Sequence, residues 1–353
     1  MQEKVFFGIE PSPEILAICS IYFVEGALGL ARLAQTFYLK DTLHLGPAEM
    51  SALTGIFTLP WTIKPLYGFI SDGFPLFGYR RRSYLILAGI LGCLSFYALG
   101  ADFWGVLGTY DDTTPITADS TILKGTVAAF LLSSACIAFS DVVADGIVVQ
   151  RTRDSNDPKV AGGLQSLCWG SAAIGGLLSA YFSGSLLEIM GPKEVFAITA
   201  ILPALVAAIA FAIDETPITS KNNEEQQQND EGGIGSQIQA LKQAIQLPAV
   251  WKPAFFLFLW QSTPTGEGAF LYFMTNDLGM GPEFLGRVRL VAAASSLFGV
   301  WLYQKYLRTV STQKCTIPMI FDNFFFHSHF LLFLVCWYLL FIHVKQKKMY
   351  RCP

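Results

Sequence analysis

The sequence predicts an all-α membrane protein, and two observations support this fold class. Of its 353 residues, 52% are hydrophobic and only 14% are charged, whereas soluble domains carry roughly a quarter charged residues. Apolar runs of about 20 residues, long enough to cross a hydrocarbon core as a helix, recur along the chain. Because a bilayer offers no water to backbone polar groups, these runs are expected to be helices.

The same composition argues against several classes of function. The net charge of −3 is too small to indicate a nucleic-acid partner. The seven cysteines are scattered without metal or disulfide spacing, so neither a metal site nor a cofactor is expected. The sequence shows no nucleophile–base set and no phosphate-binding loop, and we therefore do not expect an enzyme.

Nine apolar runs are the expected membrane passes. Six of them precede a polar, low-complexity stretch that cannot bury a core, and three follow it. The runs are 14–38, 49–70, 83–105, 125–149, 161–187, 194–213, 251–275, 283–304 and, with a weaker pattern, 324–344. The expected domains are a six-helix transmembrane half at 1–213, a cytoplasmic linker at 214–248, the start of a second half at 249–310 and an atypical hydrophobic tail at 311–353.

Lysine and arginine in the short loops predict the orientation of these passes. One set of loops carries six basic residues, which are Arg80, Arg81, Arg82, Arg151, Arg153 and Lys159. The opposite loops carry three, which are Lys40, Lys124 and Lys193. The excess predicts that the N-terminus and the polar linker lie on the cytoplasmic side.

Two short motifs recur in the same order, which indicates an internal repeat. The tetrapeptide EGAL at Glu25 returns as EGAF at Glu267, 242 positions later. The stretch LHLGPAE (Leu43–Glu49) returns as LGMGPEF (Leu278–Phe284), 235 positions later. Two like-oriented halves of six helices, facing each other across a midplane site, are the plan of the major facilitator transporters. We therefore expect a major-facilitator-type helical bundle with Glu25 and Glu267 at matching places.

The second half of this bundle is expected to be incomplete. A full repeat would run to about residue 480, whereas the sequence ends at Pro353 after eight or nine passes. The run at 324–344 differs in texture from the Gly/Ala/Ser-rich passes, and its basic tail would fall on the non-cytoplasmic side. We interpret the residues after about Ser311 as a truncated or mis-spliced end.

The stretch Lys64–Gly92 places the densest positive charge of the chain between two apolar runs. Its pattern GFISD…GYRRR has an acid, Asp72, followed by Arg80, Arg81 and Arg82. This pattern resembles the signature loop of the major facilitator superfamily, which implies a gate of inter-helix contacts on the cytoplasmic side. A loop that is basic only to fix the topology is the alternative.

Four longer stretches carry a more specific resemblance. They are YFVEGALGLARLAQTFYLKDTLHLGPAE, LPWTIKPLYGFISDGFPLFGYRRRSYLILAGILG, AFSDVVADGIVVQRTR and GGLQSLCWGSAAIGGLLSAYFSGSL. Together they resemble the folate–biopterin transporter family, in particular its plant and cyanobacterial branch, over about Val5 to Tyr306. One departure is Gln150, where an acid is expected in similar proteins, so a charge pair with Arg151 or Arg153 is expected to be absent.

Ionisable side chains inside the passes are the candidate functional residues, since each costs at least about 2.5 kcal/mol at a helix centre. Glu25 and Glu267 lie in the middle of their passes, and Arg32 follows Glu25 by seven residues on the same helical face. Asp141 and Asp145 are i, i+4 neighbours, close enough for like-charge repulsion to favour a proton on one of them.

A site for a pterin or folate needs a carboxylate for the ring edge, cations for the tail carboxylates and an aromatic ring for stacking. The expected substrate-binding residues are Glu25 or Glu267 for the ring or a proton, Arg32 and Lys64 for the carboxylates, and Trp61 or Trp169 for stacking. The expected proton-coupling residues are Asp141 and Asp145. Lys64 lies between Pro60 and Pro65, where a helix break is expected.

Each assignment has a structural alternative. Lys64 could snorkel to the inner surface, the two tryptophans could be interface or core aromatics, and Asp141 and Asp145 could only pair with the basic loops. The small residues of the run at 161–187 are expected to allow close packing rather than to bind a ligand.

The resemblance implies a secondary active transporter that moves folate or a related pterin by alternating access, with proton coupling expected. A carrier of another organic anion is one alternative. A non-transporting membrane protein, acting as a partner or regulator, is the other, and the incomplete second half favours it. A plastid envelope and a plasma membrane are both open locations.

Overall fold

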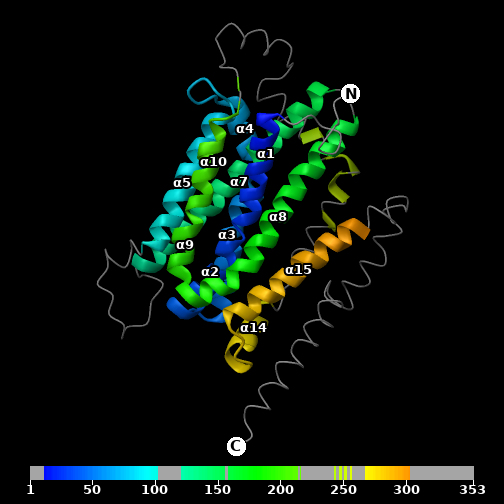
Figure 1. Ribbon diagram of the computed structural model, residues 1–353. Coiled ribbons are helices and arrows are strands. Elements are labelled where there is room, and N and C mark those ends of the chain that lie inside the picture. Colours follow the sequence, from blue (N-terminus) through cyan, green and yellow to red (C-terminus); the bar gives the residue numbers. More distant parts are fainter. Residues whose placement is uncertain are drawn as a thin grey trace, which may run out of the picture.

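The computed structural model describes residues 12–101, 121–155, 158–213, 215 and 267–302, together with short pieces between 242 and 256. In this part of the chain every regular element is a helix. Five of the described helical stretches are long and apolar enough to cross a membrane. The predicted all-α membrane fold is therefore confirmed (Figure 1).

The described helices of the first half form six stretches, of which all but α3–α4 are among the five of membrane-spanning length. The six stretches are α1–α2–η1 (Pro13–Ala27, Leu30–Phe37, Tyr38–Thr42), α3–α4 (Pro47–Thr62, Lys64–Gly73), α5 (Arg82–Gly100), α7 (Thr121–Ser155), α8 (Pro158–Met190) and α9–α10 (Pro192–Thr199, Ile201–Ala210). The second half is described in α14 (Glu267–Tyr272), η2 (Phe273–Asp277) and α15 (Pro282–Leu302). These bounds agree with the expected runs of the first half and with the run at 283–304 to within about six residues. The middle of the run at 251–275, residues 257–266, lies outside the described residues. The run at 324–344 lies outside the described residues.

The first and fifth passes pack together through glycines. A Cβ on Gly26 of α1 would lie 1.9 Å from the carbonyl oxygen of Ala172 in α8. A Cβ on Gly175 of α8 would lie 2.1 Å from the carbonyl oxygen of Phe23 in α1. Only glycine allows such backbone contact, so at Gly175 the structure agrees with the expected close-packing role of this small-residue run.

The first pass of each half ends in the same turn. Both η1 and η2 are five-residue π-helical turns, and they begin 235 positions apart. After each turn one residue adopts a left-handed backbone, His44 with φ of 51° and Gly279 with φ of 63°. The next helices, α3 and α15, then begin at Pro47 and Pro282, again 235 positions apart. The internal repeat therefore has a structural basis in this turn.

This common turn corrects one expectation about the repeat. Glu267 lies six residues before Phe273, the first residue of η2, and Arg32 lies six residues before Tyr38, the first residue of η1. Glu267 therefore corresponds to Arg32. At the structural offset of 235 the counterpart of Glu25 is residue 260, which lies outside the described residues. The expected correspondence of Glu25 and Glu267 is therefore wrong, because the EGAL/EGAF match is out of step with the turn by seven residues.

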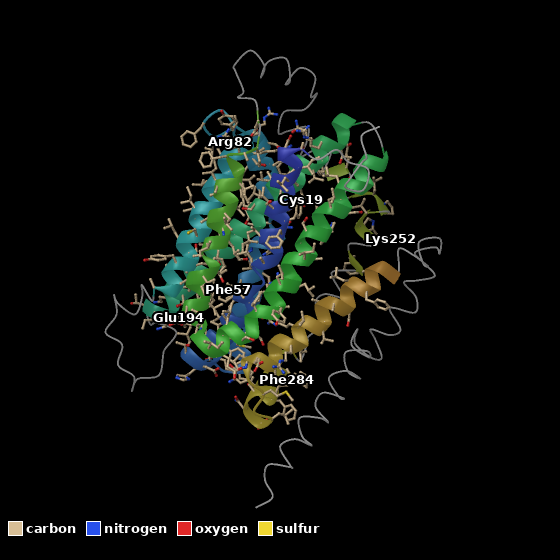
Figure 2. The ribbon with its side chains drawn as sticks, viewed as in Figure 1. Cys19, Phe57, Arg82, Glu194, Lys252 and Phe284 are labelled. Carbon is tan, nitrogen blue, oxygen red and sulfur yellow. The ribbon has the colours of Figure 1, made fainter. Side chains whose placement is uncertain are left out.

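The passes give the bundle two distinct ends. Figure 2 places Arg82 at one end, where α1 begins, and Glu194 and Phe284 at the other. The two halves contact each other at the Glu194 end, where a Cβ on Gly286 of α15 would lie 2.7 Å from the Cα of Gly184 in α8. The placement of the start of α1 and of the arginine loop at one end agrees with the orientation that the loop charges predict.

Candidate substrate site

Lys64 lies at a break in the second pass. Pro60 is inside α3 and Pro65 is in the first turn of α4, with Ile63 between the two helices at φ −97° and ψ 14°. A proline inside a helix removes one backbone hydrogen bond, whereas a proline in a first turn costs none. The predicted break is confirmed, and it puts Lys64 at the start of a new helix.

The ammonium group of Lys64 binds the carboxylate of Asp141 in α7. The side chain of Lys64 is 32% exposed and that of Asp141 only 11%, so this ion pair is largely removed from solvent. The ammonium also lies 4.4 Å from the ring centroid of Trp61, within the range of a cation–π contact. Lys64 therefore reaches into the bundle in this structure, which contradicts the alternative that it snorkels to the surface.

Glu25 joins this pair from α1. Its carboxyl group lies within electrostatic range of the Asp141 carboxylate and of the Lys64 ammonium group. Glu25 and Asp141 also line a pocket between α1, α5, α7 and α10 with room for about one water molecule.

A second contact joins α1 to α7 one turn away. The hydroxyl group of Tyr22 donates to Oδ1 of Asp145 at 2.5 Å. The two helices run in opposite directions, so Tyr22 and Glu25 on α1 face Asp145 and Asp141 on α7. Tyr22 is buried and was not among the expected site residues. Its place one turn before Glu25, matching the spacing of the two aspartates, is the signal that could have found it.

The structure brings together only part of the expected site. The residues that it gathers are Glu25, Trp61, Lys64 and Asp141, and we call these four the central cluster. Asp145 lies one turn from the central cluster and contacts it through α1 and α7. Arg32 is exposed on α2, and Trp169 on α8 is 67% exposed, so neither belongs to the cluster. The side chain of Glu267 lies outside the described residues.

The arginine loop has its own contacts at the Arg82 end. The guanidinium group of Arg81 donates to Oε1 of Gln150 at 2.7 Å and lies 3.9 Å from a carboxylate oxygen of Asp72. Gln150 therefore accepts a hydrogen bond from an arginine, but it does so as a neutral side chain and not as a charged one. Arg151 pairs instead with Glu14 at the start of α1. The predicted inter-helix contacts of the signature loop thus exist between α4, α7 and this loop.

Glu215 is a contact of the arginine loop that sequence reasoning missed. Its carboxylate accepts hydrogen bonds from the backbone amides of Arg80, Arg81 and Arg82, at 2.8 to 3.2 Å. Unpaired amides at the start of α5 favour a negative group. The guanidinium group of Arg82 lies over the rings of Tyr79 and Phe211. The three arginines therefore have different surroundings, and of the three, Arg81 is the one for which a described contact joins the guanidinium group to Asp72.

The chain is also similar to known transport proteins. The chain is 46% identical over 310 residues to the folate-biopterin transporter of Synechocystis, covering 88% of this chain and 58% of that protein. It is 30% identical over 306 residues to a probable folate-biopterin transporter 2 of Arabidopsis thaliana, with 83% and 56% covered. It is 28% identical over 293 residues to folate transporter 2 of Plasmodium falciparum, with 83% and 58% covered.

The chain thus spans less than two thirds of the length of these relatives. The sequence profile of the BT1 family matches residues 25–350. This match extends past Tyr306, where the resemblance was expected to fail, so that limit is wrong for the family as a whole. The chain is a multi-pass membrane protein of the major-facilitator-like type, and it belongs to the BT1 family.

Proposed function

We propose that this chain is a secondary active transporter that moves folate or a related pterin by alternating access. The observation that carries the proposal is the central cluster, in which three ionisable groups from three helices meet inside the bundle. Such groups are costly in a membrane, and they mark substrate or ion pathways. The names of the relatives support the substrate class.

The cluster has the chemistry that a pterin ring requires. The amidine-like edge of a pterin presents two N–H donors side by side, which a carboxylate can accept as a pair. Glu25 and Asp141 offer such carboxyl groups beside the pocket that they line. Trp61 is held under the ammonium of Lys64, so it stacks on a substrate ring only if Lys64 moves. The pair of Lys64 and Asp141 is the contact that an entering ring would rearrange.

The closeness of Glu25 and Asp141, which line the same pocket, supports coupling to protons. Like-charge repulsion between two neighbouring carboxylates favours the binding of one proton, and a donor from the substrate would replace that proton as the partner of a carboxylate. Binding of the ring would then release that proton, and its return would help to release the ring. Two further charged groups surround the site of this exchange. Lys64 binds Asp141, and Asp145 lies one turn further along α7.

The two ends of the bundle support alternating access. Among the described residues, the hydrogen bonds between the halves lie at the Glu194 end, where the hydroxyl group of Tyr272 donates to the carbonyl oxygen of Leu45 and the amide of Glu283 to the carboxylate of Glu188. At the Arg82 end, Arg81 joins Gln150 and Asp72 within the first half. We assign the described conformation to the state in which the Glu194 end is closed.

The test is uptake of labelled folate and biopterin by proteoliposomes that contain the full 353-residue chain. We expect Glu25→Gln to reduce uptake of both at least about tenfold, because it removes an ionisable partner of the ring. Glu194→Gln, at an exposed position of α9, is the matched control and should transport normally. Membrane insertion of both variants is checked by protease protection. Wild-type proteoliposomes that take up neither compound would overturn the proposal.

A further inference from the structure

Arg289 of α15 is a second intramembrane arginine that sequence reasoning did not select. Its side chain is half-buried, and the positive charge of Arg32 on α2 acts on it. The two guanidinium groups come from different halves of the chain. They are therefore held near each other by the packing of the halves and not by local sequence.

The packing of α2 and α15 on α8 explains why Arg32 and Arg289 lie near each other. Gly29, which precedes α2, faces Ser179 of α8, because a Cβ on Gly29 would lie 2.8 Å from the serine hydroxyl oxygen. Arg32 follows Gly29 by three residues. A Cβ on Gly286 of α15 would contact Gly184 of α8 at 2.7 Å, and Arg289 follows one turn later. Both arginines thus lie at the level of α8 residues 177–184, on the helices that flank it.

No carboxylate partner is described for either arginine among the side chains that the structure describes. Arg287, on the same helix as Arg289, differs because it binds Glu283 one turn away. Two like charges in a membrane protein are costly without a counter-charge. A ligand with negative groups would remove this cost, and two guanidinium forks match the geometry of carboxylates.

We propose that Arg32 and Arg289 form a binding site for the carboxylates of an anionic substrate, assembled from both halves of the transporter. This inference rests on the proposed function, and it adds Arg289 as a residue that distinguishes substrates. The ligand class is a glutamate-type dicarboxylate, as found at the tail of a folate. Biopterin carries no carboxylate and would make no use of the site.

The position of the pair agrees with a ligand that has two ends. Arg32 follows Glu25 by seven residues, which corresponds to about 10 Å along a helix. A folate separates its pterin ring from its glutamate by an aromatic spacer. The ring would lie at the central cluster and the tail at Arg32 and Arg289, nearer the Glu194 end where the halves are in contact.

The test is equilibrium binding of labelled folate and labelled biopterin to the full chain in lipid nanodiscs. We expect Arg289→Gln and Arg32→Gln each to weaken folate binding about tenfold or more, the effect of losing a hydrogen-bonded charge pair. Biopterin binding should stay within about twofold of the wild-type value, since no charged contact is lost. Arg287→Gln is the matched control on the same helix and should bind both ligands normally.

A measurement on the unchanged protein covers the case in which a variant does not fold. Free glutarate should compete with folate for the wild-type chain and should leave biopterin binding unchanged. The inference is overturned if both ligands weaken equally in the arginine variants, if neither weakens, or if glutarate has no effect on folate. If the wild-type chain binds neither folate nor biopterin, the proposed function fails as well, so the two failures can be told apart.

Discussion

The two repeats share a backbone turn but not their polar side chains. Each first pass ends in a π-helical turn, a left-handed residue and a new helix that begins at proline, 235 positions apart. In the first repeat this pass carries Glu25, which lines a pocket together with Asp141, the ion-pair partner of Lys64. In the second repeat the residue at the position of Arg32 is an acid, Glu267. The comparison shows that the turn is common to both repeats, whereas the ionisable side chains at equivalent positions differ between them.

The two repeats also share α8 as a packing surface. Gly26 of the first repeat and Gly286 of the second both contact α8 so closely that a Cβ would collide with it. The collision at Gly26 is with a carbonyl oxygen at 1.9 Å, and that at Gly286 is with the Cα of Gly184 at 2.7 Å. The first contact lies inside the six-helix half, and the second joins the two halves.

The largest expected effect is therefore that of Gly26→Ala. The collision with the backbone of α8 should destabilise the first half by about 3 kcal/mol or more. Gly286→Ala should cost less, because α15 can move as a body away from α8. Thermal unfolding of the purified chain in detergent measures both. Gly170→Ala, where an added Cβ meets nothing within 4 Å, is the control, and an equal loss in all three variants would contradict the comparison.

The next effect concerns the central cluster of the first repeat. Lys64→Met should destabilise the protein by roughly 3 kcal/mol, because it leaves the carboxyl groups of Asp141 and Glu25 without their cation. Adding Asp141→Asn should restore much of this loss, since the unpaired charge is then removed. A double-mutant cycle on thermal stability measures the coupling. Additive losses would show that the two side chains do not form a pair.

Smaller effects on stability, opposite in sign in the two repeats, are expected at the left-handed residue after each π-helical turn. Gly279→Ala should cost about 1 kcal/mol, because a side chain is unfavourable at a left-handed backbone position. His44→Gly should be neutral or slightly stabilising, because it removes that strain at the price of unfolded-state entropy. The same direction of change in both variants would argue that the two turns are not equivalent.

The smallest effect is that of Tyr272→Phe. This change removes the hydrogen bond from the second repeat to the carbonyl oxygen of Leu45, just after η1. We expect a loss of about 1 kcal/mol in the contact between the halves. Faster proteolytic separation of the halves, with unchanged stability of the first half, would be the readout. Unchanged proteolysis would remove this bond from the closure of the Glu194 end.

The sequence was sufficient for features that depend on local physics. The passes follow from apolar length, and the break at Lys64 follows from Pro60 and Pro65. The close packing at Gly175 follows from a run of small residues. Each of these is determined by a few neighbouring residues, and the structure agrees with each.

The features that sequence reasoning missed depend on contacts between distant helices. Tyr22 faces Asp145 because α1 and α7 are antiparallel, and Glu215 reaches the amides of the arginine loop across the end of the bundle. Arg289 meets Arg32 only because both halves pack on α8. The equivalence of Glu25 and Glu267 was wrong because a match of three residues carries less information than the shared turn. Local pattern could not provide these long-range relations.

The central claim is that the carboxyl group of Glu25 holds the pterin ring in the first repeat. The most direct test is equilibrium binding of biopterin, which has no carboxylate tail, to the full chain in nanodiscs. The account predicts that Glu25→Gln weakens biopterin binding at least about tenfold, while Glu194→Gln and Arg289→Gln leave it unchanged. Unchanged biopterin binding by a correctly inserted Glu25→Gln variant would contradict the account.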